Sequence, residues 1–149
     1  MPRKQWDSFI IAIDEREKMP FDFTTIGTPC VRKRLPTGDY SILGFEHRVC
    51  IERKRPAELF TNFTTQRDRF QREYERMSTF DYAAVVVEGD LATCAHETSR
   101  FSRVQPGTVI NSLISWSVRY GVYTWFAGSR VYAQTLTWRL LEKFFMHKA

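Results

Sequence analysis

Residues 38–54 of the chain read GDYSILGFEHRVCIERK. Two runs within this stretch, 39–43 and 48–54, carry aromatic or β-branched residues at alternate positions, and a short connection around Gly44 separates them. This pattern predicts two antiparallel strands joined by a turn. If the turn is centred between Phe45 and Glu46, Asp39 faces Glu52 across the strand pair.

The predicted pairing sorts the side chains of the hairpin onto two faces. Directly opposed residues in an antiparallel pair have Cβ atoms roughly 4.5–5.5 Å apart. Lys54 shares the face of Asp39 and Glu52, because side chains alternate along a strand with a period of two. The other face carries side chains typical of a core: Tyr40, Ile42, Val49 and Ile51.

Two carboxylates at this separation repel each other unless a cation lies between them. Carboxylate oxygens suit a hard divalent ion such as Mg²⁺ or Mn²⁺. Such an ion can activate water and stabilise charge on a phosphate, while a lysine orients the water or neutralises the same charge. The spacing fits a surface salt bridge between Lys54 and either acid as well, so it leaves both interpretations open.

Outside the hairpin, strand-like and helical patterns alternate along the chain. The sequence predicts buried strands at 8–13 and 82–88, a short edge strand at 31–35 and a further strand at 122–126. Helices are predicted at 56–63, 66–79, about 106–120 and 129–145, whereas 89–105 shows no clear period. The alternation predicts an α/β fold in which helices flank a central sheet, and the hairpin makes that sheet mixed.

Composition narrows the class of protein. A chain of 149 residues fits one domain, here expected to span residues 1–149, and its 43% apolar content can build a core. No apolar run approaches the ~20 residues of a membrane span, and the run at 9–13 is too short for a signal peptide. We therefore expect no membrane partner and a cytoplasmic location.

The three cysteines, Cys30, Cys50 and Cys94, form no CxxC pair and are expected to be reduced.

The motifs become more specific when they are taken together. Gly38-Asp39 followed by Glu52-Arg53-Lys54 resembles the GD…ERKxxxD signature of XPF-type structure-specific endonuclease domains. The run DERE at 14–17 resembles the DxRE of that family, and 35–40 resembles its L-x-x-GDY turn. Residues 69–70 and 85–89 resemble its basic helix and the strand that follows, and from residue 91 onward the resemblance is looser.

The resemblance implies a restriction-endonuclease-like α/β fold and hydrolysis of DNA phosphodiester bonds with Mg²⁺ or Mn²⁺ as the cofactor. It implies that Asp39 and Glu52 bind the metal and that Lys54 assists the attacking water. Asp14 and Glu17 would complete or support the acidic cluster, with Asp14 as a further metal ligand.

Three features of the resemblance qualify this assignment. Arg53 belongs to the motif but points away from the Lys54 face in the predicted register, so we expect it to be structural or to position substrate. The final Asp of the family motif falls on Glu58, whose side chain is one methylene longer. The tandem helix-hairpin-helix region that the family often carries is not expected in this chain.

DNA is the expected partner, in particular branched DNA or junctions of single strand and duplex. The net charge of +5 is a mild electrostatic preference for polyanions. Arg67, Arg69 and Arg72 on the predicted helix 66–79 are candidate phosphate contacts. Acidic residues intervene on that helix, so an ordinary charged solvent face fits its sequence as well.

A homodimer is expected from the last predicted helix. Apolar side chains on this helix occupy more than one face, and one of those faces can pack against a partner. The residues concerned are Trp138, Leu140, Leu141, Phe144 and Phe145.

Two functions remain open from the sequence. The first is a small metal-dependent DNA endonuclease of XPF type. The alternative is a non-catalytic DNA-binding or scaffold subunit on the same fold. Such subunits typically lose the acidic motif, so the joint presence of Asp39, Glu52 and Lys54 favours the enzyme.

Overall fold

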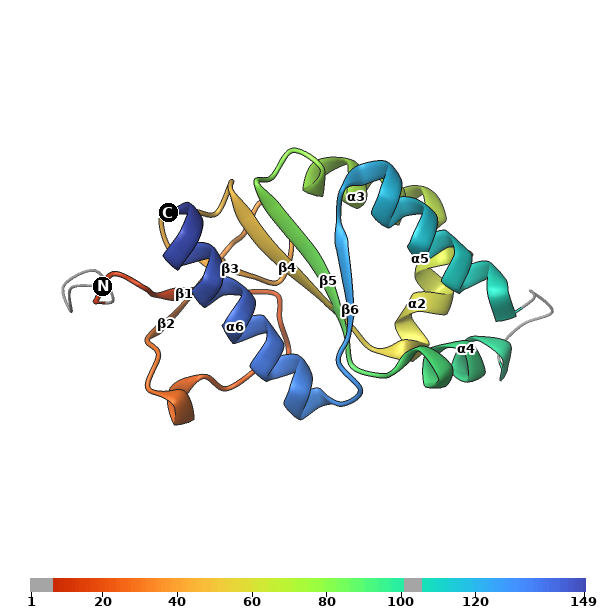
Figure 1. Ribbon diagram of the computed structural model, residues 1–149, viewed down its shortest axis with the longest axis horizontal. Helices are drawn as coiled ribbons and strands as arrows, with labels where there is room; N and C mark the ends of the chain where they lie inside the picture. Colours follow the sequence, from red (N-terminus) through yellow and green to blue (C-terminus); the bar gives the residue numbers. More distant parts are fainter. Residues whose placement is uncertain (1–6, 101–105) are drawn as a thin grey trace.

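A mixed six-stranded sheet organises the chain, and a computed structural model describes it for residues 7–100 and 106–149 (Figure 1). The strand order is β2-β1-β3-β4-β5-β6. The β1–β3 and β3–β4 pairs are antiparallel, and the other three pairs are parallel. The strands are β1 (Ile11–Asp14), β2 (Cys30–Lys33), β3 (Tyr40–Ile42), β4 (Val49–Lys54), β5 (Tyr82–Val87) and β6 (Tyr123–Phe126). The predicted mixed sheet with flanking helices is confirmed.

Helices cover both faces of this sheet (Figure 1). α6 (Arg130–Lys148) lies alone across one face, and Ser129 begins it by accepting a hydrogen bond from the backbone N–H of Tyr132. The other face is covered by α2 (Pro56–Phe63), α3 (Arg67–Met77), α4 (Leu91–Arg100) and α5 (Pro106–Tyr120). A single-turn helix, η1 (Thr24–Ile26), lies between β1 and β2 in the chain.

The predicted hairpin register is confirmed by the pairing of Tyr40 with Ile51. The backbone N–H of Asp39 also donates to the carbonyl oxygen of Ile51, at 2.9 Å. The two faces divide as alternation requires. Tyr40, Ile42, Val49 and Ile51 belong to the core beneath α6, whereas Cys50 belongs to the core beneath α2, α3 and α5.

The other predicted elements are present with shifted ends, except in the stretch that showed no period. There, residues 91–100 form α4, which the sequence analysis did not predict. The side chain of Asp90 accepts a hydrogen bond from the backbone N–H of Thr93, at 2.6 Å, and so caps the start of this helix. Residues 101–105 lie outside the described residues. The predicted strand at 8–13 begins and ends later, as Ile11–Asp14.

The apolar side chains of α6 on which a homodimer was expected pack against their own domain, so they no longer argue for a partner. Leu141, Phe144 and Phe145 are buried in the core, and Trp138 and Leu140 pack against it. Exposed apolar side chains lie at the start of α6, where Val131 is 72% exposed, and on α5, where Val118 is 83% exposed and Ile114 59%. Among the described residues, no helix has the length and hydrophobicity needed to cross a membrane.

Gly38 precedes Asp39 and allows the backbone to turn there while passing close to β4. Its φ is +83°, and a Cβ added there would lie 2.9 Å from Cys50 Cβ and 3.3 Å from the carbonyl oxygen of Ile51. Glycine is therefore required both by backbone conformation and by the close passage of β4.

We predict that Gly38→Ala lowers the free energy of unfolding more than Gly44→Ala does, as measured by urea denaturation. Gly44 has a φ of +92° with nothing within 4 Å of an added Cβ, so it is the matched control. Both variants acquire about 1–2 kcal/mol of left-handed backbone strain, and Gly38→Ala alone adds a steric clash. Equal losses in the two variants would contradict this account.

Candidate active site

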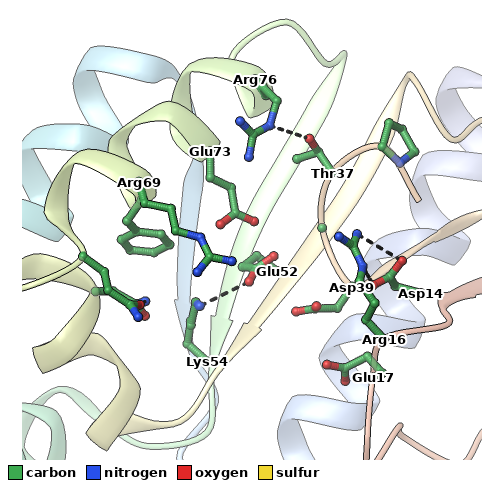
Figure 2. Close-up of a pocket in the computed structure, with 15 residues that line it drawn as sticks. Asp14, Arg16, Glu17, Thr37, Asp39, Glu52, Lys54, Arg69, Glu73 and Arg76 are labelled. Carbon is green, nitrogen blue, oxygen red and sulfur yellow. Dashed lines mark hydrogen bonds and ion pairs between the residues drawn. The ribbon is translucent and has the colours of Figure 1, made fainter. Parts of the chain in front are cut away.

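Polar side chains from three neighbouring strands meet in one cleft. β1 ends at Asp14, and Asp39 directly precedes β3. The backbone N–H of Asp14 donates to the carbonyl oxygen of Asp39 at 2.8 Å, which ties these two strand ends together. Glu52 and Lys54 come from the end of β4. The cleft has a volume of about 320 Å³ and is bounded on one side by α3 (Figure 2).

The predicted trio lies together in this cleft. Lys54 Nζ is 3.3 Å from Glu52 Oε1, and both side chains are buried, with Glu52 only 6% and Lys54 9% exposed. Asp39 Oδ2 accepts a hydrogen bond from the backbone N–H of Arg53 at 2.8 Å. The trio is therefore not a solvated surface cluster, because α3 covers it.

Burial and mutual repulsion disfavour the ionised carboxylates. Burial, followed by repulsion from Glu17, raises the pKa of Asp39 to about 7. Burial also raises the pKa of Glu52 well above its usual value, and the charges of Asp39 and Glu73 add to the effect. For Lys54, burial opposes the charged form, but the surrounding carboxylates, Glu52 first, leave its pKa raised. Lys54 is therefore an ammonium ion in this cleft.

Asp14 lines the cleft, but its carboxylate already has partners. Arg16 Nε donates to Asp14 Oδ2 at 2.7 Å, and the backbone N–H of Leu35 donates to Oδ1 at 3.0 Å. Burial acts to raise the pKa of Asp14, but these hydrogen bonds outweigh it and the pKa is lowered. Asp14 could contribute to a metal site only if Arg16 released it.

Arg53 lies on the opposite side of the sheet from Lys54, as the predicted register requires. Its guanidinium is 3.1 Å from Glu88 and 3.4 Å from Glu17, and it stacks on Phe21. The hydroxyl of Tyr40 also donates to Glu17, at 3.1 Å. Arg53 thus holds Glu17 at the rim of the cleft, and its own side chain is not available to a phosphate.

Only some of the arginines of α3 line the cleft. Arg69 and Arg76 line the cleft, and Arg76 Nε donates to Thr37 Oγ1 at 3.2 Å. Arg72, in the middle of α3, is exposed and lines a separate hollow with residues 64–69. Arg67 is held away from the cleft, where it donates to Ser112 Oγ at 3.0 Å and stacks on Trp116.

Glu73 also lines the cleft, and the sequence analysis treated it only as an intervening charge. Figure 2 shows it pointing from α3 toward Glu52, between Arg69 and Arg76. The signal that could have found it is helical spacing, because Glu73 lies four residues after Arg69 and three before Arg76. Neither Asp39 nor Glu73 forms an ion pair with any described residue.

Glu58 does not share the main cleft. Its carboxylate is 2.7 Å from Arg55 Nε, and it lines a neighbouring hollow together with Lys54 and Asn62. The residue at the position of the last acid of the motif therefore lies beside the site, in a hollow that Lys54 also lines.

The donor set fits a hard divalent cation. Asp39 and Glu52 could supply oxygen ligands, and the excess of carboxylates around them favours a positive ion. Within residues 7–100 and 106–149, no three His, Cys, Asp or Glu side chains converge on one point. Mg²⁺ does not need such a cage, because it is usually bound by one or two carboxylates, with waters and substrate phosphates as the other ligands.

The mixed six-stranded sheet flanked by helices gives the chain a restriction-endonuclease-like fold. The chain belongs to the ERCC4 domain family, whose model matches residues 13–137. Its fold is that of an XPF-type nuclease domain, as the sequence resemblance indicated.

Two solved structures are similar in fold to this chain. XPF from Aeropyrum pernix matches with a TM-score of 0.71 and 17% identity, over 90% of this chain and 60% of that one. The same protein in complex with DNA matches with a TM-score of 0.70 and 17% identity, over 91% of this chain and 64% of that one. This chain thus spans less than two thirds of each. A search of curated proteins gave no significant match.

We predict a stability signature of Asp39 in the metal-free protein. Its folded-state pKa of about 7 lies above the value of ~3.9 in an unfolded chain. The folded state therefore binds more protons between these values, and the stability that Asp39 contributes below pH 4 is lost as pH rises toward 7. In urea denaturation with EDTA, we subtract the free energy of unfolding of Asp39→Asn from that of the unmodified protein. This difference should fall as the pH rises from about 4 to 7.

Added Mn²⁺ should flatten that trend, because a bound cation favours the ionised carboxylates. If the difference in free energy of unfolding between the unmodified protein and Asp39→Asn rises with pH in EDTA, the raised pKa assigned to Asp39 is wrong.

Proposed function

We propose that this chain is a divalent-metal-dependent DNA endonuclease that hydrolyses phosphodiester bonds. The observation that carries the proposal is the meeting of Asp39, Glu52 and Lys54 in one cleft beneath a basic helix. Membership of the ERCC4 domain family supports it. Hydrolysis transfers the hydroxyl of water to phosphorus and its remaining proton to the departing ester oxygen, which leaves a phosphomonoester and an alcohol.

Each side chain of the trio has a part in this reaction. Asp39 and Glu52 would hold Mg²⁺ or Mn²⁺, which supplies charge neutralisation at the phosphate and a more acidic bound water. Lys54 carries a positive charge and has no acceptor, so it donates to the phosphate or the water and does not remove a proton. Glu73 and Glu17 add negative charge near the proposed metal ligands and favour cation binding.

The rim of the cleft suits a polyanion. Arg69 and Arg76 flank Glu73 along α3, and Arg72 extends the basic surface toward the start of that helix. These three arginines would contact phosphates on either side of the bond that is cut. The solved complex of Aeropyrum pernix XPF with DNA supports DNA as the substrate. Within DNA we propose branched and flap structures, to be tested with a panel of labelled duplex, flap, fork and single-stranded substrates.

Glu52→Gln and Lys54→Ala test the enzyme directly. Glu52→Gln keeps the side-chain volume and removes a metal-binding charge, and Lys54→Ala removes the cation at the phosphate. Cleavage in Mg²⁺ or Mn²⁺ should fall by at least ~10²-fold in each variant, the scale of one preorganised electrostatic group. DNA affinity measured in EDTA at fixed salt should change far less, because α3 supplies the phosphate contacts.

The matched control is Arg69→Ala combined with Arg72→Ala, which should weaken binding and flatten its dependence on salt. If Glu52→Gln cuts as fast as the unmodified protein, the site is misassigned. A protein that binds branched DNA but cuts none of the panel in either metal would be a scaffold subunit.

We also propose that the chain forms a homodimer, through α5 and β6. Ile114 and Val118 of α5 line an apolar groove of about 270 Å³ together with Thr124 and Phe126 of β6. β6 lies at the edge of the sheet, so the groove borders an open strand. Exposed apolar surface of this kind is typical of association sites.

Val118→Glu should give a monomer in light scattering at a concentration where the unmodified protein is a dimer. Met19→Glu is the control, because Met19 is also exposed (71%) but lies between β1 and β2, away from this groove. A monomeric unmodified protein at tens of micromolar would contradict the proposal.

A further inference from the structure

The cleft contains a buried hydrogen-bond acceptor that has no partner. Asn62, on α2, is only 9% exposed, and its Oδ1 receives no hydrogen bond from any described residue. Its Nδ2 donates to Gln66 Oε1 at 3.3 Å, so one half of the amide is held while the other half is unpaired. An unpaired buried acceptor costs stability, and native proteins seldom retain one without a reason.

The position of Asn62 distinguishes it from other unpaired atoms. Asn62 lines the main cleft with Glu52 and also the neighbouring hollow with Glu58, and Lys54 lines both. The remaining described side chains that have an unpaired buried oxygen do not line the cleft: Tyr74, Thr124 and Thr137. Of this group, only Asn62 can reach a molecule in the active site.

The site needs an acceptor of this kind. An attacking water must direct a lone pair at phosphorus, so its protons need acceptors that fix its orientation. An ammonium group only donates, so Lys54 cannot serve. A further carboxylate would accept, but it would also repel the phosphodiester. A neutral amide oxygen accepts without adding charge.

We propose that Asn62 Oδ1 accepts a hydrogen bond from the water that attacks the phosphate, and that Asn62 thereby orients this water beside Lys54. The inference rests on the proposed endonuclease function and adds to it a water-orienting residue from α2. The water's hydroxyl joins phosphorus and its other proton goes to the departing ester oxygen, so Asn62 itself gains and loses no proton.

Asn62→Leu separates this role from a structural one, because the melting temperature should rise while the kcat for cleavage falls. Leucine has a similar shape and leaves no buried acceptor, and Gln66 is exposed and can bond to water instead. The melting temperature should rise by roughly 2–4 °C. The kcat for cleavage should fall about 10- to 100-fold, with DNA affinity and Mn²⁺ affinity unchanged.

Two further variants complete the test. Thr137→Val removes another unpaired buried oxygen, on α6 at the opposite face of the sheet, and should raise the melting temperature without changing kcat. Asn62→Asp keeps an acceptor of the same shape but adds a charge that repels the phosphodiester, so its kcat should lie between those of Asn62→Leu and the unmodified protein.

The outcomes separate this inference from the proposed function. Asn62→Leu that cuts as fast as the unmodified protein would overturn the role of Asn62 and leave the endonuclease intact. A loss of Mn²⁺ affinity in Asn62→Leu, measured by calorimetry, would also overturn it, because Asn62 would then be a metal ligand. An unmodified protein that cuts no DNA would instead overturn the proposed function.

Discussion

The repulsion between the half-buried carboxylate of Asp39 and the buried carboxylate of Glu52 is the constraint on which the site depends. The hairpin register places them on the same face of the sheet, and α3 then covers them and adds Glu73. Lys54 offsets only part of this charge, at 3.3 Å from Glu52. A fold that buries acids in this way loses stability unless a cation or protons compensate. The same arrangement that weakens the metal-free protein therefore favours a divalent ion.

The alternation of side chains along β4 assigns two different tasks to adjacent residues. Glu52 and Lys54 face the cleft, whereas Arg53 faces the core beneath α6 and pairs with Glu17 and Glu88. Arg130, at the start of α6, joins this second group through Glu88 at 3.2 Å. A shift of one residue in the register would exchange the two sets, which is why Gly38 and the pairing of Tyr40 with Ile51 matter for the site.

The hairpin and its two faces could be predicted from the sequence, because alternation and a turn act over a few residues. The orientation of α3 could not, because it depends on how the helix crosses the sheet. The sequence analysis named Arg67, Arg69 and Arg72 as candidate phosphate contacts, but in the structure Arg72 does not line the cleft, whereas Arg76 and Glu73 do. The sequence also could not show that Arg67 donates to Ser112 and stacks on Trp116. Nor could it show that Leu141, Phe144 and Phe145 of α6 are buried in the core of their own domain. These contacts join residues far apart in the chain.

The central claim is that Asp39 and Glu52 together hold a divalent ion. The most direct test is the anomalous diffraction signal of Mn²⁺ in crystals of the protein grown or soaked with that ion. The account predicts one strong peak in the cleft, within roughly 2.0–2.3 Å of a carboxylate oxygen from each residue. A strong peak elsewhere with none between these two side chains, or no peak at Mn²⁺ concentrations that support cleavage, would contradict it.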